Sequence, residues 1–135
     1  MTFYPISPVA CPRMTKRDRW KKRPVVVAYF AFRDEVRLAK VNLPIPYKVT
    51  FHVEMPPSWT KKKRIAMDGT PHLDTPDKDN FEKAFLDALF GNDSHVWSGW
   101  AEKRWASVPG IEVIPLPLER AIVRRIPPDL FAEAV

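Results

Sequence analysis

Fifteen prolines divide this chain of 135 residues into short segments, and they constrain its fold more than any other sequence feature. Most stand in pairs or near-pairs, and proline ends helices and is excluded from the middle of a sheet. Each segment between them is therefore expected to be a single helix or strand. The length fits one domain, residues 1–135, and 45% hydrophobic residues are enough for a core.

The hydrophobic pattern predicts the elements of that domain. Apolar residues recur at helical spacing over 25–40 and 80–90, and they alternate with polar residues over 47–53. Two more strands are expected over 95–106 and 111–116, joined as a hairpin through residues 107–110. We therefore expect a small domain that combines helices with a sheet.

Lysine and arginine (22 against 16 acidic residues) are concentrated in two stretches. The first is a basic N-terminal arm, residues 1–23, and the second is a loop, residues 58–76, expected to be mobile. Such clusters suit a protein that binds the DNA backbone, although solvated surface loops explain the charge alone equally well. The candidate DNA-binding residues are Arg13, Lys16, Arg17, Lys61, Lys62, Lys63, Arg64 and His72. For His72, an exposed loop histidine without a function is the alternative.

The location is expected to be the cytoplasm. A single cysteine, Cys11, excludes an intrachain disulfide and a cysteine-rich zinc site. Prolines interrupt the N-terminus where a signal peptide needs an apolar core, and the longest apolar run, residues 25–32, is far below the ~20 residues of a membrane helix. We expect no membrane contact and no small-molecule cofactor.

Acidic residues gather immediately before and after the segment 80–90. If the chain is extended before this helix, Asp77 and Asp79 project to one side, and Lys83 lies one helical turn after Asp79. Carboxylates, waters and substrate phosphates are the usual ligands of Mg²⁺, so the group suits phosphodiester cleavage. On spacing alone, however, helix capping and ordinary ion pairs are the favoured explanation.

The run Pro-Asp-x-Asp-Asn-x-x-Lys-x-x-x-Asp-Ala-Leu from Pro76, followed by Asp-x-x-Val from Asp93, resembles the signature of the RusA family of Holliday-junction resolvases, particularly its phage and prophage members. The resemblance covers residues 45–116. It implies a homodimer of small α/β (α+β) subunits, each with a mixed sheet packed against helices. It further implies Mg²⁺-dependent (or Mn²⁺-dependent) nicking of two opposed strands of a four-way DNA junction. Carried over by position, Asp77, Asp79 and Asp93 would be the catalytic metal ligands and Lys83 the catalytic lysine.

Two departures from the family pattern leave alternatives open. Asn92 stands where relatives commonly carry an aspartate. A helix from Asn80 to Phe90 would be roughly 16 Å long and would separate Asp93 from Asp77. Either the chain returns past the start of the helix, or Asp93 completes the site of the partner subunit. The alternative functions are a non-catalytic protein that binds branched DNA and a nuclease that prefers flaps or forks.

Tryptophan is abundant near the end of this region. Trp97, Trp100 and Trp105 follow Asp93 within twelve positions. An indole could stack on an unpaired base at a junction centre. Burial in the core or in a dimer interface is the interpretation that we favour.

Overall fold

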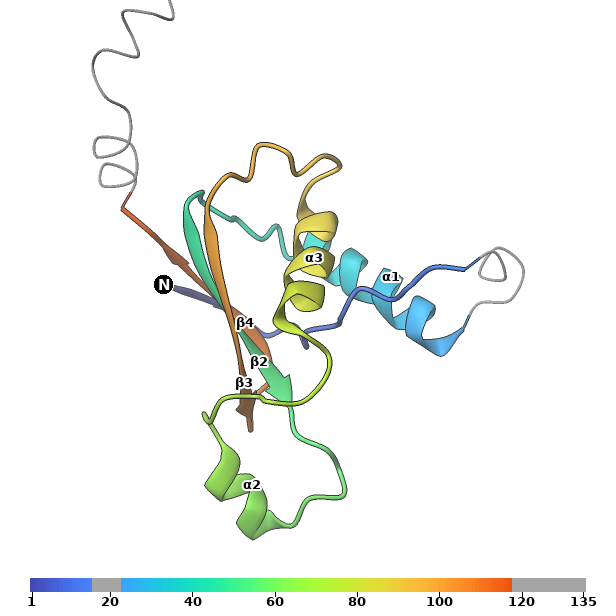
Figure 1. Ribbon diagram of the computed structural model, residues 1–135, viewed down its shortest axis with the longest axis vertical. Helices are drawn as coiled ribbons and strands as arrows, with labels where there is room; N and C mark the ends of the chain where they lie inside the picture. Colours follow the sequence, from blue (N-terminus) through green and yellow to red (C-terminus); the bar gives the residue numbers. More distant parts are fainter. Residues whose placement is uncertain (16–22, 118–135) are drawn as a thin grey trace, which may run out of the picture.

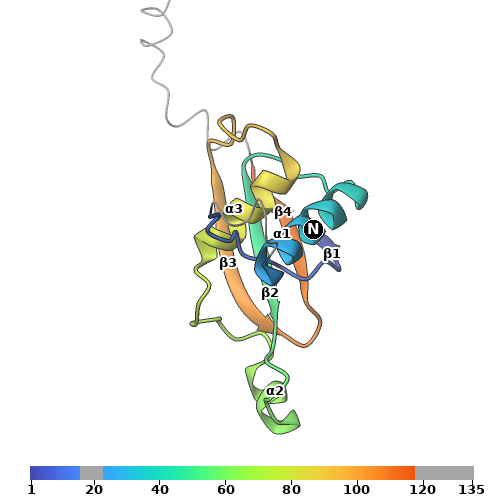
Figure 2. The ribbon, with the colours of Figure 1, turned by 90° about the vertical axis from the view of Figure 1, so that its right-hand side faces the viewer.

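The computed structural model describes residues 1–15 and 23–117. Helices α1 and α3 lie on one face of a twisted sheet, and α2 stands apart beyond one end of it (Figures 1 and 2). In chain order the elements are β1 (Thr2–Tyr4), α1 (Pro24–Leu38), β2 (Tyr47–Glu54), α2 (Lys61–Met67), α3 (Lys78–Leu89), β3 (Gly99–Ala106) and β4 (Gly110–Pro115). In the described ranges, no helix has the length and apolar character needed to cross a membrane.

The sheet is mixed, with the strand order β1-β4-β2-β3. Strand β2 pairs in parallel with β3 along its whole length and antiparallel with β4 over residues 47–52. The predicted hairpin between the last two strands is therefore wrong, because β2 lies between them. A hairpin there would leave the main-chain groups of β2 without partners along one edge, which is costly for a buried strand. The prediction of a mixed sheet packed against helices in a small α+β domain is confirmed.

The core lies between the sheet and the two helices on its face. Tyr47, Val49 and Phe51 alternate toward this face and are at most 1% exposed. Phe51 stacks on Phe81 of α3 at 5.7 Å and meets Phe85 edge-on at 5.9 Å between ring centroids. Helix α1 contributes the buried stripe Val26, Tyr29, Phe32 and Val36. The predicted helices and the strand at 47–53 are confirmed within about two residues at each end, whereas β3 begins at Gly99 rather than at His95.

The N-terminal segment is more ordered than the prediction of a basic arm allowed. Residues Thr2–Tyr4 form an edge strand against β4, and Ile6 is 5% exposed in the core. The segment then runs to α3, where the Cys11 amide donates to the Asn80 carbonyl at 3.0 Å. Of the candidate residues in the arm, Arg13 lies two positions beyond this contact and is exposed. Lys16 and Arg17 lie outside the described residues, as does the tail at 120–135.

Helix α2 occupies part of the segment predicted to be a loop. The Thr60 hydroxyl accepts a hydrogen bond from the Lys63 amide at 3.2 Å and caps the helix. Lysine and arginine are good helix formers, so a cap followed by four basic residues is sufficient for a short helix. The prediction of a continuous loop over 58–76 is wrong for residues 61–67.

Candidate functional site

Asp77 and Asp79 lie at the start of α3. The helix begins at Lys78, so Asp77 takes the N-cap position with an extended backbone, and its side chain makes no capping hydrogen bond. Asp79 lies in the first turn, and its side chain is 83% exposed. The expectation that both residues project from an extended segment is wrong for Asp79, since it is helical. Both carboxylates are open to solvent at the helix end that favours negative charge.

Lys83 lies one turn after Asp79 and is exposed. Burial raises the thiol pKa of Cys11 in the N-terminal segment, the charge of Lys83 lowers it, and the charge of Asp87 raises it. Asp87 accepts a hydrogen bond from the Tyr29 hydroxyl of α1 at 3.5 Å, which agrees with the structural role that its place on the helix suggests.

Asp93 lies in the loop between α3 and β3, and the structure shows where this loop runs. The hydroxyl of Tyr47 donates to Glu82 Oε2 at 2.7 Å. Burial raises the pKa of Tyr47, as do the hydrogen bond to Glu82 and the charges of Glu82 and Asp93. The charge of Asp93 thus acts on the Tyr47 hydroxyl. After Phe90 the chain passes beyond the end of α3 and crosses to β3 (Figure 1).

The three aspartates do not form a compact ligand set in one subunit. Within residues 1–15 and 23–117, no group of three or more His, Cys, Asp or Glu side chains is close enough to hold a metal ion. Of the two alternatives for Asp93, convergence with Asp77 and Asp79 within one chain is therefore not seen in this arrangement. Completion by a partner subunit stays a prediction.

The donor chemistry still fits Mg²⁺. This ion commonly takes one or two protein carboxylates and fills its remaining positions with water and substrate phosphate oxygens. Asp77 and Asp79 are neighbouring, exposed hard-oxygen donors at a helix start. The site is therefore chemically suited to an ion that binds together with DNA.

Sequence reasoning missed Glu82 and Tyr47. Glu82 lies three residues after Asp79, so the helical spacing itself places it near that carboxylate. Tyr47, in contrast, carries no local signal, because its contact with α3 joins residues 35 positions apart.

The lobe formed by α2 presents three exposed lysines, Lys61, Lys62 and Lys63. The Lys63 ammonium lies 4.3 Å from the centre of the Trp59 ring, which packs on Trp105 at 4.8 Å. Arg64 differs from these lysines because its guanidinium donates to the carbonyls of Trp59 at 3.2 Å and Pro56 at 2.9 Å. Its position favours holding the lobe together over contacting DNA.

The connector between α2 and α3, residues 69–76, is fixed to the edge of β3. Main-chain hydrogen bonds join Gly69 and Thr70 to Trp105, and His72 to Lys103. The Lys103 ammonium donates to the carbonyls of Asp74 and Pro76. The residue that precedes Asp77 is thus held directly by the sheet.

His72 is buried, which corrects its assignment as a DNA-binding residue. Its side chain is turned inward by the pairing with β3, is 4% exposed, and packs 4.1 Å from Trp105 between ring centroids. Burial lowers the pKa of His72, and the charge of Lys103 lowers it further. A neutral imidazole that is 4% exposed and packed against an indole is a core residue.

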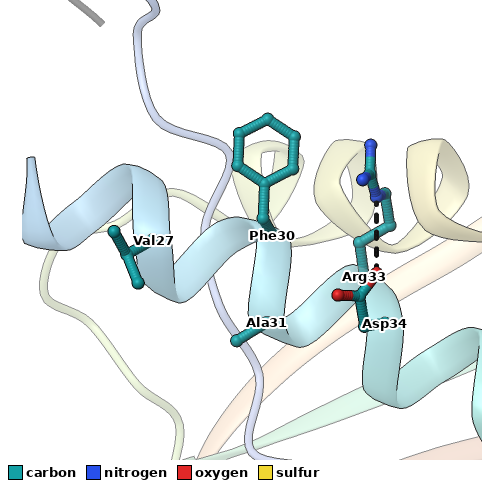
Figure 3. Close-up of a pocket in the computed structure, with 5 residues that line it drawn as sticks. All are labelled: Val27, Phe30, Ala31, Arg33 and Asp34. Atoms are coloured by element: carbon teal, nitrogen blue, oxygen red, sulfur yellow. Dashed lines mark ion pairs between the residues drawn. The ribbon is translucent and has the colours of Figure 1, made fainter. Parts of the chain in front are cut away.

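Two other surfaces are exposed. Trp97 and Trp100 are 54% and 63% exposed and so lie outside the core of the subunit, while Trp105 is buried in it. Burial of Trp97 and Trp100 in a dimer interface stays a prediction. A hollow of about 610 Å³ lies along the outer side of α1 (Figure 3). Val27, Phe30, Ala31, Arg33 and Asp34 line it. It contains none of the predicted site residues.

Comparison with known families identifies the class of protein. The sequence model of a family described as endodeoxyribonuclease RusA matches residues 5–114, starting well before the motif-based resemblance at residue 45. The chain is thus of the endodeoxyribonuclease class. It belongs to the RusA family. Searches of curated proteins and of solved structures returned no significant match.

Proposed function

We propose that this protein is a homodimeric, Mg²⁺-dependent endonuclease that resolves Holliday junctions in the cytoplasm of a bacterial or phage-infected cell. The observation that carries the proposal is the pair of exposed carboxylates, Asp77 and Asp79, at the start of α3, within a chain of the RusA family. Membership of the family accounts for endonuclease chemistry and for the binding of branched DNA. The carboxylates supply ligands for the metal ion that this chemistry needs.

Each residue has a distinct role in this proposal. Asp77 and Asp79 would hold Mg²⁺, or Mn²⁺ in its place, and Asp93 would complete the set from the partner subunit or after a shift of its loop. When bound, the ion supplies charge neutralisation at the scissile phosphate and acidifies a water molecule. Lys83, exposed one turn after Asp79, donates to a phosphate oxygen and orients the strand for cleavage.

A dimer follows from the geometry of the substrate. Resolution requires cuts in two opposed strands of a two-fold junction, and a two-fold dimer supplies two sites. An uncovered apolar surface on α1 supports this part of the proposal, since Val25, Val27 and Phe30 are 45%, 49% and 39% exposed. A second copy would remove such side chains from water.

A nicking assay tests the function. Purified protein is incubated with a four-way junction, a fork, a flap or a linear duplex, each with and without Mg²⁺. In a separate measurement, the mass of the protein without DNA is determined by light scattering. We expect paired nicks in the junction only with Mg²⁺, and a particle of twice the chain mass of 15.6 kDa. Preference for flaps or forks would replace the resolvase assignment. Binding without nicking at any metal concentration would indicate a non-catalytic branched-DNA-binding protein.

Replacing Lys61, Lys62 and Lys63 together by alanine is expected to weaken junction binding and its salt dependence. Each lost phosphate contact lowers the slope of log affinity against log salt by about 0.9, so three lost contacts lower it by up to about 2.7 for each subunit that touches the DNA. Alanine preserves helix propensity. The slope is measured by fluorescence anisotropy between low and moderate salt. The matched control replaces the same lysines by arginine, which keeps the charge and should keep the slope; an unchanged slope in the alanine variant would remove the α2 lobe from the DNA-binding surface.

A further inference from the structure

Helix α2, which stands beyond one end of the sheet (Figures 1 and 2), presents a large apolar side chain to solvent. Ile65 is 71% exposed, and it follows Lys61 and Lys62 by four and three positions, so the three side chains share one face of the helix. The other face holds Lys63 and Arg64, whose side chains turn toward the segment before the helix. The outward face of α2, formed by Lys61, Lys62 and Ile65, therefore combines positive charge with an apolar surface.

A hollow of about 230 Å³ lies beside Ile65, and Lys61, Arg64, Asp68 and Ser107 complete its lining. Pockets for drug-sized ligands measure roughly 300–1,000 Å³, so this smaller hollow suits a single ring system. Two cations and one carboxylate line it, and this balance favours a ligand that carries a negative charge. A nucleotide meets both conditions, with its base against the apolar side chain and its phosphate near the lysine.

Both ends of α2 are fixed to the rest of the domain. Asp68 accepts hydrogen bonds from the Ser107 amide at 2.9 Å and from the Ser107 hydroxyl at 3.2 Å, which joins the end of α2 to the turn between β3 and β4. Thr60 caps the start of the helix, and the preceding Trp59 packs on Trp105 of β3 at 4.8 Å between ring centroids. The outward face is therefore held rigidly, as a side chain that separates stacked bases needs to be.

We propose that Ile65 contacts an unstacked base of branched DNA, the base lying in the hollow beside α2 while Lys61 and Lys62 bind the neighbouring phosphates. This inference rests on the proposed function and names the part of the DNA that α2 recognises. Aliphatic side chains such as isoleucine are among those that proteins insert between bases. An unpaired base costs less to unstack than a paired one, whereas lysines bind any DNA backbone. The apolar contact thus supplies selectivity for a branch point that the charges alone do not.

The test replaces Ile65 by alanine. Alanine is a better helix former than isoleucine, so α2 is retained. Val108→Ala is the matched control, because Val108 is also branched at Cβ, is 64% exposed and follows Ser107 directly, yet does not line the hollow. Affinity is measured by fluorescence anisotropy without divalent ions for a four-way junction, a duplex with one unpaired nucleotide and a fully paired duplex. In a parallel set of probes, 2-aminopurine at the branch point or at the unpaired position reports unstacking by brighter fluorescence.

Ile65→Ala is expected to bind the junction and the duplex with the unpaired nucleotide about tenfold more weakly, as the loss of one apolar contact implies. The rise in 2-aminopurine fluorescence on binding should be smaller. Affinity for the paired duplex and the slope of log affinity against log salt should stay unchanged, because no charge is removed. Ile65→Leu keeps an apolar side chain and should behave as the unaltered protein does, and so should Val108→Ala.

Three outcomes separate this inference from the proposed function. If the unaltered protein nicks junctions and Ile65→Ala binds all three probes as well as it does, or loses affinity for all three equally, the base contact is overturned and the proposed function stands. If the unaltered protein prefers the branched probes, Ile65→Ala loses that preference and no nicking occurs at any metal concentration, the base contact stands and the nuclease assignment fails. If the unaltered protein neither nicks nor prefers the branched probes, both fail.

Discussion

Junction cleavage by Asp79→Asn is expected to be at least about 100-fold slower than cleavage by the unaltered protein, with junction binding retained. Asparagine keeps the size of the side chain but removes the negative charge that favours a divalent cation, and such an ion contributes several kcal/mol at the scissile phosphate. Each 1.36 kcal/mol corresponds to about tenfold in rate. Binding persists because it depends on the exposed lysines of α2. Single-turnover nicking and anisotropy measure the two quantities separately.

Glu35→Gln is the matched control for this experiment. Glu35 is an exposed carboxylate of α1, and it belongs neither to the acidic motif nor to the residues that line the hollow on this helix. Its replacement should leave the cleavage rate within about twofold. Wild-type cleavage by Asp79→Asn, or equal losses in both variants, would contradict the assignment of the start of α3 as the cleavage site.

Phe85→Ala is expected to lower the free energy of unfolding by about 3–5 kcal/mol, the usual cost of removing a large aromatic side chain from a core. Phe85 is 0% exposed and packs edge-on against Phe51 of the central strand. Its removal leaves a cavity between α3 and β2, the two elements that carry Glu82 and Tyr47. Urea unfolding followed by circular dichroism gives the value.

The control for Phe85→Ala is Leu73→Ala, because Leu73 is an apolar residue that is 87% exposed. Its replacement should change the stability by no more than about 0.5 kcal/mol. A loss below about 1 kcal/mol in Phe85→Ala would mean that α3 does not pack on the sheet as described here.

Periodicity predicted α1, β2 and α3 because the spacing of apolar residues within each element defines its buried face. The hairpin failed for the opposite reason: β3 and β4 are close in sequence, but the unpaired edges of β2 decide their positions, and no local pattern reports which strand lies between two others. His72 was misplaced similarly, since its burial comes from main-chain pairing with a strand some thirty residues further along the chain.

In the candidate site, too, local relations could be predicted from the sequence and long-range ones could not. The motif placed Asp77, Asp79 and Lys83 on or beside one helix, since their relation is local. Asp93 depends on the path of an irregular loop after α3, which no local pattern reports. The helix length predicted a separation between Asp93 and Asp77, and within the described residues no three acidic, histidine or cysteine side chains come together to hold a metal ion.

Because residues 69–76 are attached to β3, the segment between α2 and the acidic motif is a rigid connection and not a flexible linker. Hydrogen bonds from Arg104 to the Gly69 carbonyl at 2.8 Å and from Lys103 to the Pro76 carbonyl at 2.6 Å secure its two ends. Duplex DNA bound by the lysines of α2 would then reach Asp77 at a distance that the protein fixes. Insertion of one residue within 69–76 should shift the position of cleavage or slow it, while the affinity for DNA stays unchanged.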